Sequence, residues 1–184
     1  MREINSVNDP ISGITQAIIT RLREFFLEKI WNIEIVPDPM TLHEFNRLVG
    51  ITPCLALSWL GFKTDDQSRD IHATLEFSLT IILKNPQNRD NRFLGTQHKP
   101  GLFQVVSAVS TALHGYTLKD YGTISVKDCG QRYAEGSSDQ NLVIATVLFN
   151  LQTLFDDILN EAATDYFLGL LNAPTVEDGN EDEE

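Results

Sequence analysis

Residues 71–84 set the main constraint on the fold, because apolar and polar residues alternate along almost the whole stretch. Side chains of a strand point to opposite faces in turn, so a period of two over this length predicts one long strand. One face of that strand is expected to pack and the other to be mostly exposed to water. The packing positions are Ile71, Ala73, Leu75, Phe77, Leu79, Ile81 and Leu83.

Further strands are predicted on both sides of this one. Residues 54–61 are apolar at nearly every position and lie between a proline and a glycine, which is typical of a buried central strand. Ile33 and Ile35 indicate a short strand that ends at Pro37-Asp38-Pro39. Residues 122–133 form a weaker strand, and turn residues 135–139 join it to a β-rich stretch at 141–151, which predicts a hairpin.

Helical spacing of apolar residues predicts an amphipathic helix over residues 10–30, with Asp9 as its cap and Pro10 at its first position. Three more helices are expected: a short one at 41–49, one that begins at Pro100-Gly101, and one at 153–171. For the last, Thr153 and Asp156 have the spacing of a capping box.

The order of these elements predicts an α+β fold with a mixed, mainly antiparallel sheet packed against two or three helices. No internal repeat or linker interrupts residues 1–172, so they are expected to form a single domain. Residues 173–184 are expected to be a disordered acidic tail, and residues 85–99 a polar loop.

The net charge of −12 is unevenly placed, because residues 177–184 contain six acids and no base. Without them the chain has 20 acids and 14 bases, so its net charge is about −6. This negative charge argues against binding to nucleic acid. A solvated end is the simpler interpretation of the acidic segment; DNA mimicry or a basic partner is the alternative.

Cys54 and Cys129 are far apart in the sequence, the first residues do not resemble a signal peptide, and no apolar run approaches a membrane span. Synthesis in the cytoplasm with free thiols is therefore expected.

Catalytic and cofactor motifs are absent from the sequence. It has no glycine-rich phosphate loop, and its four histidines lack metal-ligand spacing. A polar turn explains Asp65, Asp66 and Asp70 more simply than a metal site, and a helix start explains Asp156 and Asp157. Cys129 would need a base that the sequence does not indicate. We therefore expect no enzymatic activity, no cofactor and no metal.

Four segments resemble the tail terminator, or tail-completion, proteins of Mu-like contractile-tailed phages. They are the opening helix at 11–30, residues 53–62, residues 101–106 leading through 112–118, and the closing strand at 147–151. The resemblance extends over about residues 8–152. It implies a virion protein at the tail–neck junction, made and assembled in the cytoplasm of a bacterial host.

The resemblance also implies a homo-oligomeric ring, usually a hexamer. Such a ring caps the tail tube and sheath, stops their polymerisation, and docks the head connector or neck protein while genomic DNA passes through without specific binding. Candidate subunit contacts are the polar loop, with Arg89, Arg92, His98 and Lys99, and the sheet edge, with Ile124 and Val126. Solvation of both regions is the alternative. A neck or head-completion protein of the same virion, or a free acidic binding module, would also fit the sequence.

Overall fold

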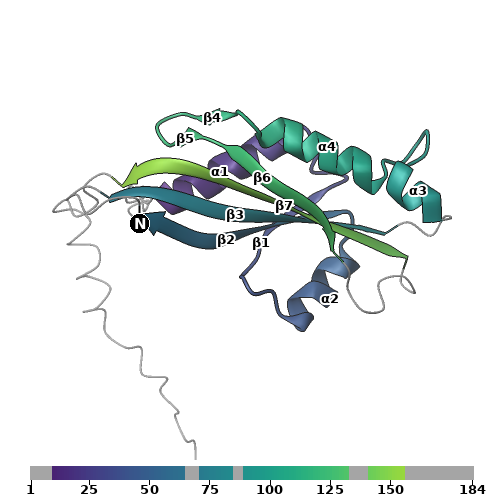
Figure 1. The fold of residues 1–184 in the computed structure, drawn as a ribbon. Coiled ribbons are helices and arrows are strands. Elements are labelled where there is room, and N and C mark those ends of the chain that lie inside the picture. The colour runs from purple at the N-terminus through teal and green to yellow at the C-terminus, as the bar shows by residue number, and fades with distance from the viewer. Residues whose placement is uncertain (1–9, 65–70, 85–88, 133–140, 156–184) are drawn as a thin grey trace, which may run out of the picture.

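The computed structural model describes residues 10–64, 71–84, 89–132 and 141–155 (Figure 1). Five strands form one sheet in the order β1-β2-β3-β7-β6, and only the β1–β2 pair is parallel. The predicted α+β fold with a mixed, mainly antiparallel sheet is therefore confirmed. The strands are β1 (Asn32–Ile35), β2 (Cys54–Thr64), β3 (Ile71–Lys84), β6 (Ser125–Arg132) and β7 (Leu142–Phe155).

The predicted long strand is β3, which lies in the middle of the sheet and pairs with β7 from Ile71↔Phe155 to Lys84↔Leu142. Its odd positions from Ala73 to Leu83 are buried, as the alternation predicts. Ile71, which was also expected to pack, is 44% exposed at the start of the strand. The even face is less exposed than predicted, because Ser78 and Ile82 are buried as well.

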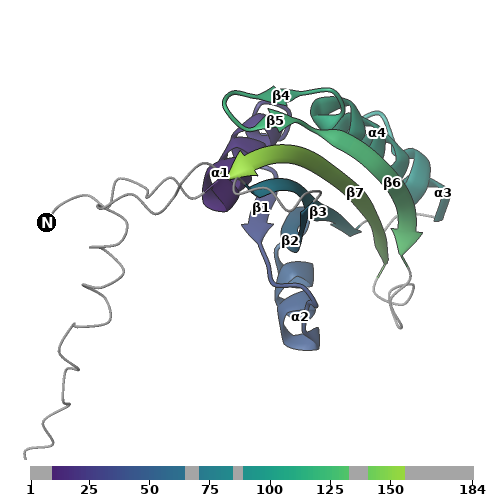
Figure 2. The same cartoon turned by 60° about the vertical axis from the view of Figure 1, so that its left-hand side comes forward.

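Two helices cover the odd face of the sheet and one covers part of the even face (Figures 1 and 2). α1 (Pro10–Arg23) and α4 (Leu102–Leu113) pack their apolar residues against the odd positions of β3 and β7. α2 (Leu42–Gly50) packs Leu48 against Ile82 and its neighbours at one end of the even face, in a second cluster. This small cluster comprises Val36, Leu48, Cys54, Ala56, Ile82 and Leu142.

The C-terminal ends of α1 and α4 are joined by Arg21. Its Nε donates to the carbonyl oxygen of Ala112 at 3.0 Å, and its guanidinium lies 4.2 Å from the ring centre of Tyr116. Such a cation–π contact contributes on the order of 1 kcal/mol when it is partly shielded from water.

The first helix is shorter than predicted, since it ends at Arg23 rather than at residue 30. The N–H groups of Phe25 and Phe26 both bond to the carbonyl of Leu22, which closes the helix with a tight turn. Phe26 is then buried edge-on against Trp31, with ring centres 5.0 Å apart. Helical spacing continues past Arg23 in the sequence, but the chain must turn back there so that β1 can pair with β2.

The predicted central strand is buried only in its first half. Residues Cys54 to Ser58 are buried, whereas Trp59, Leu60 and Phe62 are exposed. β1 pairs only with Cys54–Leu57, and the register shifts between Trp59 and Gly61. Beyond that point β2 has no described neighbour on its outer side.

Two elements were not predicted. α3 (Arg89–Leu94) lies within the expected polar loop, and β4 (Thr117–Leu118) pairs with β5 (Gly122–Thr123) in a small separate ribbon. The predicted strand at 122–133 is consequently divided at Ile124, whose N–H bonds to the carbonyl of Tyr116 at 2.9 Å.

The prediction that a helix begins at Thr153 is wrong. Thr153 is buried within β7 and pairs with Ala73, because β3 offers a partner for every residue up to Phe155. Asp156 and the rest of that helix, the turn at 135–139 and the acidic tail lie outside the described residues.

Gly122 gives a test of the packing between the small ribbon and the main sheet. A Cβ atom on Gly122 would lie 2.2 Å from the carbonyl oxygen of Gln152 in β7, and its φ of +124° is unfavourable for L residues. We expect Gly122→Ala to lower the free energy of unfolding by roughly 2 kcal/mol or more in urea titrations.

Gly50→Ala is the matched control, because no atom lies within 4 Å of that added Cβ. It should be neutral or slightly stabilising, since glycine is unfavourable within a helix. Equal effects of the two substitutions would contradict the close approach of β5 and β7.

Candidate subunit-contact surfaces

A cavity of about 480 Å³ lies where β2 begins and β3 ends. Its apolar lining includes Trp31 and Leu83, which are buried, and Ile30, Pro53 and Pro100. Four basic side chains also line it, namely Lys84, Arg92, His98 and Lys99. We call this cavity the cationic pocket.

The segment between α3 and α4 folds back on itself and places His98 and Lys99 at this pocket. The Thr96 N–H donates to the Lys99 carbonyl at 2.8 Å, and the Thr96 hydroxyl accepts from the Lys99 N–H at 3.1 Å. Gly95 and Gly101 approach so closely that a Cβ on Gly101 would lie 2.2 Å from the Gly95 nitrogen. The loop therefore has a defined shape, which its polar composition did not indicate.

Three of the four predicted loop contacts thus come together. Arg92, His98 and Lys99 line one pocket, and Arg89 begins α3. Arg92 also donates to the side-chain oxygen of Asn141, which links α3 to the start of β7. Trp31, which is distant from the loop in the sequence, and Lys84, which directly precedes it, belong to the same pocket.

The two lysines of the pocket, Lys84 and Lys99, do not take part in the ion pairs found among the described residues. Those pairs join Arg21 to Glu24, Arg47 to Glu34 and Glu44, and Lys63 to Glu76. Over the described ranges, neither Lys84 nor Lys99 has a carboxylate partner. Both lysines are exposed and can bind an added anionic group.

The predicted sheet edge exists, because β6 is the outermost strand beside β7. Ile124 does not belong to its surface: its side chain is 1% exposed and lies in the main core. Val126 is half-buried against that core, and its N–H donates to His114 Nδ1 at 3.2 Å. Alternation alone suggested an exposed edge here, but the division at Ile124 and a bulge before Asp128 turn these residues inward.

A third surface was missed because its residues are apolar. Trp59, Leu60 and Phe62 lie in the outer half of β2, each about 40% exposed, at 41%, 38% and 43% respectively. We call this stretch the β2 edge. Exposed apolar strand edges favour pairing with another chain, so its exposure makes it a candidate contact.

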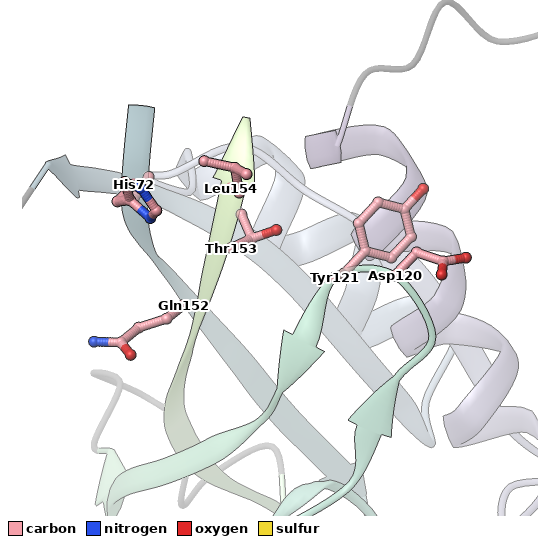
Figure 3. A pocket seen from close by; sticks show the side chains of 7 residues that line it. His72, Asp120, Tyr121, Gln152, Thr153 and Leu154 are labelled. Carbon is pink, nitrogen blue, oxygen red and sulfur yellow. The ribbon is translucent and has the colours of Figure 1, made fainter. Parts of the chain in front are cut away.

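A second cavity, of about 400 Å³, lies at the end of β7 where it meets the β4–β5 ribbon. Figure 3 shows His72 and Gln152 on one side of β7 and Asp120 and Tyr121 on the other, so their polar groups diverge. Tyr121 packs over α1, where a Cβ on Gly13 would lie 2.1 Å from its hydroxyl oxygen. This arrangement does not bring an acid and a base together.

The described part of the chain contains neither a metal-binding cluster nor a membrane-spanning helix. No three His, Cys, Asp or Glu side chains there are grouped so that they could hold a metal ion. None of the described helices is both long enough and apolar enough to cross a bilayer.

The two cysteines differ in environment and give a test of the fold around these surfaces. Burial in the small cluster raises the pKa of the Cys54 thiol to about 11, with a smaller contribution from Glu34. Cys129 is exposed on β6; partial burial and the neighbouring Asp128 raise its pKa.

At pH 8 we expect iodoacetamide to modify Cys129 in the native protein and to leave Cys54 unmodified. The thiolate is the reactive form, and a pKa of about 11 leaves on the order of one part in a thousand of Cys54 ionised. Mass spectrometry of the digested protein reads out each site, with Cys129→Ser as the control. Modification of Cys54 at a similar rate before unfolding would contradict its buried position.

Comparisons with known proteins show a likeness in fold to one solved structure. A solved structure titled "Virion of native gene transfer agent (GTA) particle" contains a chain similar in fold, with a TM-score of 0.50 and 12% sequence identity. The match covers 80% of this chain and 98% of that one. No curated protein matches the sequence.

The family described as Bacteriophage Mu, Gp37 matches residues 10–135, more than two thirds of the chain. The matched range includes α1 to α4, the β2 edge, the strand β6 and all the basic residues of the cationic pocket. The chain belongs to the bacteriophage Mu Gp37 family.

Proposed function

We propose that the chain is a structural virion protein that acts as the tail terminator of a contractile-tailed phage. In this role a ring of subunits caps the tail tube and sheath, stops their polymerisation and presents a docking surface to the head connector. Membership of the phage Mu Gp37 family over residues 10–135 is the observation that carries the proposal. The likeness in fold to a chain of a gene transfer agent virion supports it.

The two ends of the sheet support a ring in physical terms. β6 forms one border, and the β2 edge forms part of the other. The two borders differ, so a contact between them joins subunits head to tail, and such contacts close into rings when the rotation allows. A specific interface of this kind buries on the order of 800 Å² per partner.

The ring that we propose is a hexamer at the tail–neck junction, assembled in the host cytoplasm. Its partners are further copies of itself, the tube and sheath proteins and the neck protein. Six copies have a formal charge of 6 × (−12) = −72. An acidic or neutral lumen would let genomic DNA pass without binding, because phosphates are repelled by like charge.

Removal of the gene from a phage that encodes this chain tests the role directly. Electron microscopy should then show tails of abnormal length that do not join heads, because nothing stops the tube and sheath from growing. A neck or head-completion protein would instead leave tails of normal length beside separate heads. Infectious particles with normal tails would rule out both.

The β2 edge gives a test of the ring itself. Leu60 is 38% exposed, and a lysine there would place a charge within the proposed apolar contact. We expect Leu60→Lys to abolish the oligomer in light scattering after size exclusion, with an unchanged circular dichroism spectrum that shows the subunit is folded.

Leu42→Lys is the matched control, because Leu42 is 75% exposed at the start of α2 and does not belong to either border strand of the sheet. It should leave the oligomer intact. An oligomer of unchanged size and stability in Leu60→Lys would exclude the β2 edge from the interface.

A further inference from the structure

The cationic pocket has the chemistry of a site for an acidic peptide with apolar residues beside its charges. Trp31, Leu83 and Pro53 supply an apolar surface, and Lys84 and Lys99 supply positive charge at the rim. A volume of about 480 Å³ lies within the ordinary range for ligand pockets. Lysine and arginine bond to carboxylates by charge-assisted hydrogen bonds, which are stronger than neutral ones.

The chain itself contains a segment that matches this chemistry. Ala173, Pro174 and Val176 precede the six acids of residues 177–184. The apolar residues suit the apolar lining of the pocket, and the acids suit its basic rim. We propose that the cationic pocket binds the acidic segment 173–184 of a second copy of this chain.

Distance favours a second copy over the same copy. β7 ends at Phe155, paired with Ile71, whereas the pocket lies at Leu83 and Lys84, at the other end of β3. Thirteen residues of strand separate these points, which is about 43 Å at 3.3 Å per residue.

The 21 residues 156–176 would have to bridge that distance within one copy. A relaxed chain of this length spans about 25 Å and a helix about 30 Å. Either falls short of the pocket in the same copy unless the segment is stretched, which lowers its entropy. A neighbouring copy whose pocket lies within about 30 Å of Phe155 would avoid this cost.

This inference rests on the homo-oligomer in the proposed function and adds a contact to it. Each copy would be tied to another both by the sheet borders and by its acidic segment. A second tether raises the effective concentration of the first contact. The tether is electrostatic and exposed, so it should weaken as salt screens it.

Carbodiimide cross-linking of the full-length protein tests the contact, because this reagent joins a lysine amine to a carboxylate only when they touch. Equal amounts of ¹⁴N and ¹⁵N protein are assembled together and cross-linked, and the peptides are identified by mass spectrometry. We expect cross-links from Lys84 or Lys99 to acids within residues 177–184, with mixed isotopes that place the two ends in different copies.

Lys99→Glu provides the test of charge, with Lys84 left in place as the reporter. It should reduce the Lys84 cross-link several-fold, whereas Lys119→Glu, an exposed lysine in the β4–β5 ribbon, should leave it unchanged. Thermal unfolding checks that both variants are folded. Equal cross-linking in the two variants would refute the role of the pocket.

The isotopes and the mass of the oligomer separate the two proposals. Cross-links confined to single copies, or the lack of any between the pocket and the acids, would overturn the inference even if the oligomer forms. The ring on which the inference rests would instead be overturned if the free protein is monomeric in light scattering and the protein also binds to tails as a monomer.

Discussion

The pairing of β3 with β7 is the interaction on which the rest of this structure depends. The two strands run antiparallel over all 14 residues of each, from Ile71↔Phe155 to Lys84↔Leu142, without a shift in register. Phe77 and Phe149 face each other at the middle of the pair, with stacked rings 5.7 Å apart. A slip of one residue would move every buried side chain to the opposite face, so the register is strongly specified. β2 and β6 then add to the outer sides of this pair, and α1 and α4 cover its odd face.

The sheet is covered unevenly. Some of its surfaces are packed within the subunit, and others remain open to a partner. One face is closed by two helices, whereas α2 closes only one end of the other. β1 pairs with four residues of β2 and leaves the rest of that border open. The apolar side chains at the β2 edge add less to the stability of one subunit than fully buried ones would, because each remains about 40% exposed. They fit an assembly protein, in which surfaces of this kind become buried between subunits.

The candidate contacts show which residues local sequence patterns can identify and which they cannot. A polar loop rich in basic residues was sufficient to single out Arg92, His98 and Lys99, which the structure brings to one pocket. Trp31, which lines the same pocket, is distant from that loop in the sequence. Lys84 directly precedes the loop, but its place at the end of the predicted strand did not mark it as a contact. Ile124 was misplaced because a short alternation looks the same whether a strand is continuous or divided. The backbone of Ile124 bonds to Tyr116 and Gly115 across the base of the β4–β5 ribbon, and its side chain lies in the core.

The sequence by itself determined the class of fold, the long central strand, the short helix at α2, and the face of β3 that is buried. It could do so because periods of 2.0 and 3.6 residues are local properties of the chain. The tertiary structure decided where α1 ends and how far β7 extends. α1 stops at Arg23 because the chain must return to β1, and β7 continues past Thr153 because β3 extends that far. It also decided which basic side chains share a pocket and which apolar ones remain exposed, since both depend on contacts between residues distant in the sequence.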